Sequence, residues 1–180
     1  KVVFTDVMFV DDMPTSDPEF GKQLDQALVG GGTRYIFPAY PEEIGADERE
    51  PDGLSHAFLI AQVVADRRQK VDVGHALPIR TGLEVTGGIA RKRDRDTQDV
   101  LWNCALLAAW RMLDLDPARA TIDGTMLRLG AWESSLGGND YFSFQWTDEK
   151  EGFRTLSLAE AMKHIREEDG QVFAGKLVVI

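Results

Sequence analysis

Apolar residues along the chain fall into two patterns, and each pattern predicts a different kind of element. Continuous β-branched and aromatic runs predict buried strands at Val2–Val10, Arg34–Ala39 and Lys176–Ile180. A helix is predicted after Asp17, because one helical face carries Phe20, Leu24, Ala27 and Leu28. The glycines at 30–32 end this helix. The first three elements therefore form a strand–helix–strand unit, which builds a parallel sheet.

The rest of the chain predicts further elements of both kinds. They are a helix over 54–68, a strand over 71–79, a hairpin turning at Gly87–Gly88, a helix from about Thr97 to Leu113, strands at 125–130 and 141–146, and a helix over 156–170 capped by Ser157. No internal repeat or low-complexity tract divides the chain. Strands alternating with capped helices predict one α/β domain over residues 1–180, with a mixed, mainly parallel sheet flanked by helices.

Composition narrows the range of partners. Hydrophobic residues make up 43% of the chain and charged residues 28%, which is ordinary for a folded domain. The formal net charge of -10 argues against nucleic acid and against docking on anionic lipid headgroups. The single cysteine, Cys104, excludes an internal disulfide, and its apolar neighbours predict a packing role. The basic run RKRDRD at 91–96 is typical of a solvated hairpin edge, since its charges alternate in sign at its end.

The opening strand carries carboxylates that raise the question of a site. Asp6 lies within the strand, and Asp11 and Asp12 follow it. A receiver domain also ends a strand on an aspartate, but it needs an earlier acidic pair and a later lysine that this chain does not supply. Phosphatases with an aspartate nucleophile need a second aspartate two positions on, where Met8 stands. Two hypotheses stay open: a structural turn, which we favour, and a metal-dependent hydrolase or phosphatase that uses the three aspartates.

Elsewhere the sequence offers little catalytic chemistry. The three histidines stand far apart, serines lack the flanking glycines of a nucleophile elbow, and no glycine cluster opens a helix as a phosphate loop does. We therefore expect no catalytic residue, no metal and no cofactor. Asp6, His75 and Arg91 are the candidates for the lining of a ligand pocket, because they are polar residues in or beside strands, where an unpaired polar group is costly.

As an ordered series, the segments resemble the second type of CHASE domain, an extracellular sensory module of bacterial receptors. VVFTDVMF, DPEFGKQLDQAL and TRYIFPAY match its opening strand, helix and strand. DVGHALPI matches its Gly-His strand, GGIARKR its turn with a basic exit, and LWNCALLAAW its alanine- and leucine-rich helix. YFSFQW, LSLAEAMKHI and VFAGKLVVI match the short strand, the helix and the terminal strand with which the family's domain ends. The family begins with a further strand–helix unit, so the resemblance implies a domain trimmed at its N-terminus.

This resemblance implies a sensing function. The chain would be an excerpt of a membrane receptor, lying in the periplasm or outside the cell between membrane helices that are not part of it. The output inside the cell would be a cyclase, a histidine kinase or a protein kinase, and the signal a small molecule or a protein. Asp6 would then shape the end of its strand. A homodimer is expected, with the exposed side of the 156–166 helix and the Trp132 hairpin as interface candidates.

Overall fold

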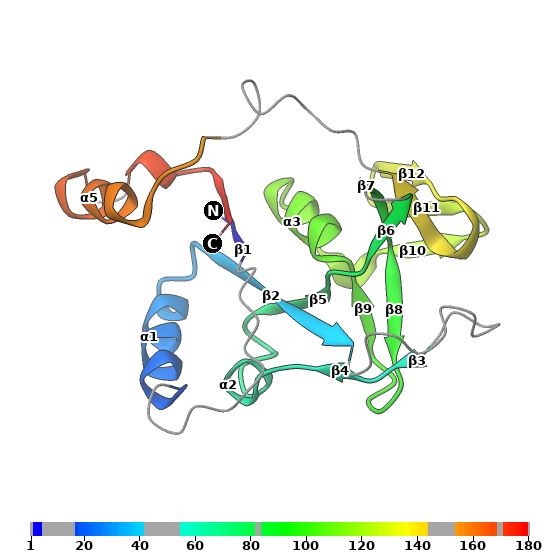
Figure 1. The fold of residues 1–180 in the computed structure, drawn as a ribbon, viewed down its shortest axis with the longest axis horizontal. Helices are drawn as coiled ribbons and strands as arrows, with labels where there is room; N and C mark the ends of the chain where they lie inside the picture. The colour runs from blue at the N-terminus through cyan, green and yellow to red at the C-terminus, as the bar shows by residue number, and fades with distance from the viewer. Residues whose placement is uncertain are drawn as a thin grey trace.

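A computed structural model describes residues 2–4, 17–41, 55–81, 84–143, 154–168 and 171–179 (Figure 1). The helices are α1 (Asp17–Val29), α2 (Gln62–Ala65), α3 (Cys104–Met112) and α5 (Leu158–Glu168), with the 3-10 turns η1 (Pro117–Arg119), η2 (Gly138–Asp140) and η3 (Gln171–Phe173). The strands are β1 (Val2–Phe4), β2 (Arg34–Pro41), β3 (Ser55–His56), β4 (Phe58–Leu59), β5 (Asp72–His75), β6 (Pro78–Thr81), β7 (Glu84–Ile89), β8 (Arg91–Asp94), β9 (Val100–Trp102), β10 (Thr121–Asp123), β11 (Met126–Leu129), β12 (Trp132–Ser135), β13 (Tyr141–Ser143) and β14 (Leu177–Val179).

The main sheet contains the three strands that the sequence predicts most directly. Its order is β14-β1-β2, and both β4 and β5 lie beside β2. Val2 pairs in parallel with Leu177 on one side and with Arg34 on the other. β5 is also parallel to β2, whereas β4 is antiparallel to it. The α/β fold with a mixed, mainly parallel principal sheet is therefore confirmed, and the part of the first predicted strand beyond Phe4 lies outside the described residues.

Helices cover both faces of the main sheet, because neighbouring residues of a strand point to opposite sides. Ile36 belongs to a buried cluster with residues of α3, including Leu107 and Trp110. The next residue, Phe37, belongs instead to a cluster with residues of α1 and α2, including Leu24. Ala27 belongs to the predicted apolar face of α1 but is exposed. The apolar face that α1 buries is therefore narrower than the sequence indicates.

The largest cluster contains three tryptophans. Trp110 is fully buried, and its ring meets Trp102 edge to face at a centroid distance of 5.2 Å and Trp132 in the same manner at 5.8 Å. Cys104 is 2% exposed within the same cluster, which confirms its packing role. Trp132, a predicted interface residue, is partly buried against this core, so its indole is engaged within the chain.

Three smaller sheets, β10-β11-β12, β13-β7-β6 and β3-β8-β9, were not predicted as such. The predicted turn at Gly87–Gly88 is wrong, since β7 continues through both glycines and pairs with β13. A Cβ on Gly87 would overlap the carbonyl oxygen of Phe142, and one on Gly88 would lie 2.9 Å from Nδ2 of Asn103. The two glycines therefore allow close approach of backbone and side chain within a strand.

Two predicted helices also prove shorter than their apolar patterns suggest. The helix expected from Thr97 begins at Cys104, because 100–102 form β9 and pair antiparallel with β8. The helix expected over 54–68 begins at Gln62, because β4 pairs with the end of β2 at Tyr40. Residues 71–79 likewise divide into β5 and β6. Tertiary pairing overrides the local pattern at each of these places.

The predicted C-terminal helix is confirmed as α5, and Ser157 caps it. The amide of Ser157 donates to Oε2 of Glu160 at 2.8 Å, and the amide of Glu160 donates to Oγ of Ser157 at 3.2 Å. This reciprocal pair is a capping box. α5 projects from the rest of the fold, at the left of Figure 1. Neither it nor any other helix in the described ranges has both the length and the apolar composition needed to cross a bilayer.

Candidate functional site

The carboxyl ends of β2 and β5 meet at one edge of the main sheet, where Ala39 is in register with His75. In open sheets of parallel strands, ligands bind at this edge. A second sheet joins here, since His75 forms an isolated parallel bridge with Asn103, the residue between β9 and α3. We call His75, Asn103, Ala90 and Arg91 the β5–β9 junction.

His75 forms the inner end of this junction. It is fully buried, and its Nδ1 accepts a hydrogen bond from the backbone amide of Leu77 at 3.3 Å. Its ring lies 6.1 Å from that of Phe58, tilted by 34°. This hydrogen bond from Leu77, two positions on, fixes the orientation of the His75 ring.

Asn103 connects the strands to α3. Its backbone amide donates to the carbonyl of Ala90 at 2.9 Å, and its side-chain oxygen accepts from the amide of Ala105 at 3.0 Å as the N-cap of α3. The residue is 4% exposed. Sequence reasoning missed Asn103, although an asparagine directly before the apolar helix CALLAAW is itself an N-cap signal.

Arg91 forms the outer end of the junction. Its side chain is 40% exposed, and its Nε donates to Oδ2 of Asp140 at 2.8 Å. The carbonyl of Asp140 also accepts from the amide of Ala90 at 2.8 Å. Asp140 and Asn139 have φ angles of 58° and 59°, a left-handed conformation that costs energy for residues other than glycine. Nothing in the sequence pattern indicates Asp140 as a partner, because the pairing spans 49 positions.

The structure thus brings together two of the three predicted pocket residues. His75 and Arg91 lie on the two sides of Asn103. His75 forms a bridge with the backbone of Asn103, and Arg91 follows Ala90, whose carbonyl accepts a hydrogen bond from the amide of Asn103. Asp6, with Asp11 and Asp12, falls outside the described residues, and the metal hypothesis built on these aspartates stays a prediction. Within the described ranges, no group of at least three His, Cys, Asp or Glu side chains is placed to hold a metal ion.

An ion pair fixes α3 against β5 at the ends of both elements that lie away from the junction. Arg111 donates to both carboxylate oxygens of Asp72 at 2.6 Å, and the two side chains are 19% and 17% exposed. The hydrogen bonds to Asp72, followed by its charge, raise the pKa of Arg111 above its ordinary value, against the opposing effect of burial. Two-point pairing of this kind sets the orientation as well as the distance of the helix.

The basic run at 91–96 is not the hairpin edge that the sequence predicts, because β8, which holds Arg91–Asp94, lies between β3 and β9 in its sheet. Arg93 donates to the carbonyl of Gln98 at 2.9 Å, and Arg95 lies 3.4 Å from the carboxylate of Asp96. Asp94 is 3% exposed, and its Oδ1 accepts from the amides of residues 96 and 97, which closes the turn between β8 and β9. These arginines are therefore engaged locally, and Arg91 is the member of the run that belongs to the junction.

Comparison of the chain with family models, with curated proteins and with solved structures found no match.

Proposed function

We propose that this chain is a signal-sensing domain of a bacterial transmembrane receptor and lies on the extracytoplasmic side of the membrane. The adjacency of β14, β1 and β2 in one sheet supports this function. Their sequences open and close the series of segments that resembles the second type of CHASE domain. Segments that are far apart along the chain therefore form a single three-dimensional unit, as a domain with that order of motifs requires.

The β5–β9 junction is the proposed signal-binding region. Arg91 offers a partly exposed cation at its outer end, and the fully buried His75 lies at its inner end. Asn103 joins both to the start of α3, which packs over the main sheet. A ligand that engages Arg91 must compete with the carboxylate of Asp140, so the ligand chemistry that fits is an anionic group on a small molecule or a protein.

Signalling would then be a shift between two arrangements of α3 on the sheet. A ligand moves such an equilibrium only by its difference in affinity for the two arrangements. Release of Asp140 from Arg91 gives that difference a structural origin, because Asp140 also holds Ala90, and Ala90 holds Asn103. In the receptor, the shift would pass through flanking membrane helices to a cyclase or kinase, in a homodimer.

A thermal-shift screen of a metabolite library against the chain is the first experiment. For an anionic hit, Arg91→Ala should abolish the shift, because the cation is lost. Asp140→Asn is the matched variant: it keeps the shape of the partner and removes its competing charge, so binding should tighten. Asp6→Ala and His75→Ala complete the set. Binding that is unchanged in the Asp6, His75 and Arg91 variants would place the pocket elsewhere.

The rival function is a metal-dependent hydrolase or phosphatase that uses Asp6, Asp11 and Asp12. Calorimetric titration with magnesium and manganese separates it from the sensor. A sensor with no metal site gives no heat of binding. Tight binding that is lost when Asp6→Asn and Asp12→Asn are combined would favour the enzyme and count against the proposed function.

A further inference from the structure

β14 forms an open edge of the main sheet. Among the described residues it pairs with β1 alone. Val2, which is in register with Leu177, is 1% exposed and lies in the cluster that α3 covers. Residues in register on neighbouring strands point to the same face of a sheet, so Leu177 and Val179 point to the α3 side. They are nevertheless 39% and 58% exposed, and α3 therefore stops short of β14.

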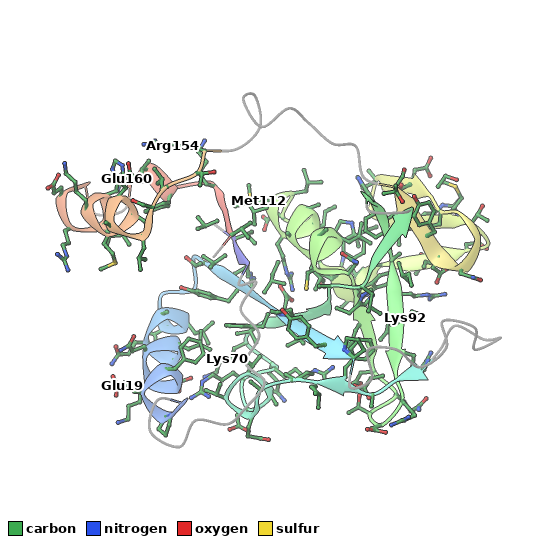
Figure 2. The ribbon with its side chains drawn as sticks, viewed as in Figure 1. Glu19, Lys70, Lys92, Met112, Arg154 and Glu160 are labelled. Atoms are coloured by element: carbon green, nitrogen blue, oxygen red, sulfur yellow. The ribbon has the colours of Figure 1, made fainter. Side chains whose placement is uncertain are left out.

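α5 presents an apolar face that the described part of its own chain leaves largely exposed. Leu158, Met162 and Ile165 recur at helical spacing and are 78%, 39% and 49% exposed. Among the described elements, η3 contacts α5 more than any other element does. An isolated helix of 11 residues is marginal in water, and helices of this length are normally stabilised by burying such a face. Figure 2 shows the side chains of α5, including the labelled Glu160, standing clear of the sheet and of α3.

Chain topology indicates what belongs over β14. A helix that leads into a parallel strand normally packs back onto the sheet beside its neighbours. α5 leads into β14, but β14 and β1 separate it from α3 in the view of Figure 1. The turn from η3 into β14 is hydrogen-bonded: the amide of Ala174 donates to the carbonyl of Gln171, that of Lys176 to Phe173, and that of Val2 to Lys176, at 3.0, 3.2 and 3.3 Å. Gly175, with φ of 67°, provides the left-handed residue in this turn.

We propose that two copies of this chain exchange α5, so that the helix of each copy packs on Leu177 and Val179 of the other. This assignment goes beyond the sensing function and does not depend on it. The exchange buries the exposed apolar face of α5 and that of β14 at the same time. It also retains the hydrogen bonds of the 171–176 turn. Direct pairing of α5 with α5 would leave β14 uncovered, and pairing of β14 with β14 would leave α5 uncovered. Exchange of an identical element is a low-cost route to a closed dimer.

Sedimentation equilibrium of the chain should show a monomer–dimer equilibrium. Ile165→Glu on α5 and Val179→Glu on β14 should each raise the dimer dissociation constant by at least about tenfold, because each buries an unpaired charge. The matched controls are Lys163→Gln and Lys176→Gln, which change the net charge by the same amount at exposed polar positions. Both should dimerise like the parent chain. Circular dichroism of every variant checks that the fold is retained.

Mixing the two weakened variants tests the exchange itself. A chain carrying Ile165→Glu keeps an intact β14, and a chain carrying Val179→Glu keeps an intact α5. An exchanged heterodimer therefore has one intact contact, and both glutamates fall in the other contact, which a single glutamate already breaks. The mixture should therefore dimerise more tightly than either variant alone. A mixture no tighter than its components would overturn the exchange in favour of self-pairing. A parent chain that stays monomeric up to millimolar concentration would also overturn it, as would weakening by the lysine controls. If the glutamate variants unfold, Ile165→Asn and Val179→Thr replace them in the same mixing experiment.

Discussion

The helices α3 and α5 are similar in length, 9 and 11 residues, yet different forces hold them. α3 has a local N-cap in Asn103, but the rest of the fold also anchors it: Asp72 of β5 holds Arg111, and Trp110 is fully buried in the core. α5 is held by its neighbours in sequence, through the capping box of Ser157 and Glu160. A helix fixed by packing depends on the whole fold, whereas one fixed by its cap can form and dissolve almost alone.

The largest expected difference between the two helices comes from truncating an apolar side chain in each. Trp110→Ala should lower the free energy of unfolding by about 3–5 kcal/mol, because a fully buried indole is lost and a cavity remains. Ile165→Ala should change it by no more than about 0.5 kcal/mol in dilute protein, where α5 is uncovered. Urea unfolding followed by far-ultraviolet circular dichroism measures both. Equal losses would show that α5 is buried in the monomer and would end the contrast.

Adding one methyl group tests how closely α3 packs on the sheet. A Cβ at Gly74 would lie 2.5 Å from the carbonyl oxygen of Trp102 and 2.7 Å from Cδ1 of Leu107. Gly74→Ala should therefore destabilise the fold by about 1–3 kcal/mol, since backbone must move. Gly30→Ala is the control, because a Cβ there meets nothing within 4 Å. Thermal unfolding of the two variants compares them, and a neutral Gly74→Ala would show that α3 can slide on β5.

Ion pairs sharpen the same contrast. A double-mutant cycle with Asp72→Asn and Arg111→Met should give a coupling energy of about 1–2 kcal/mol, because the pair is two-pronged and mostly buried. The pair of Lys163 and Glu167 on α5, 3.8 Å apart and exposed, should give about 0.3–0.5 kcal/mol. Raising the salt concentration should weaken the second pair more than the first. Coupling of equal size in the two cycles would contradict this difference in solvent screening.

The smallest effect is the pH dependence of the α5 cap. The hydrogen bonds from the hydroxyl and then the amide of Ser157 hold the pKa of Glu160 below its ordinary value of 4.5. Because the folded pKa is the lower one, the contribution of the cap is complete above the unfolded pKa and disappears as the pH falls through the folded pKa. Carbon-13 NMR titration of the Glu160 carboxyl should show this lowered pKa, and Ser157→Ala should return it toward 4.5. If the pKa of Glu160 were the same in Ser157→Ala, the capping box would not be the cause of the lowered pKa.

Sequence patterns succeeded where the deciding interaction is local. Ser157 and Glu160 are three positions apart, so the start of α5 could be predicted, and the β-branched runs of β1, β2 and β14 indicate strands buried in a sheet. They failed where a distant partner decides. The apolar run that follows Thr97 suits a helix until Val100–Trp102 pairs with β8. Gly87 and Gly88 suit a turn until β13 lies against them.

The candidate site divides along the same line. His75 and Arg91 could be selected from the sequence as polar residues in or next to strands. Asp140 could not, since its pairing with Arg91 depends on two left-handed residues and a contact 49 positions away. Asn103 was within reach as an N-cap, but its link to His75 exists only once β5 and β9 lie side by side.

The edge-to-face contacts of Trp110 with Trp102 and Trp132 also decide which part of the protein near-ultraviolet circular dichroism reports on. Rings at centroid distances of 5.2 and 5.8 Å couple their electronic transitions, so near-ultraviolet circular dichroism reports how α3 sits on β9 and β12. α5 contains neither tryptophan nor tyrosine and contributes nothing to that spectrum. A sample in which α5 is unfolded, or is exchanged between two copies, would therefore give the same near-ultraviolet circular dichroism bands as one with α5 intact.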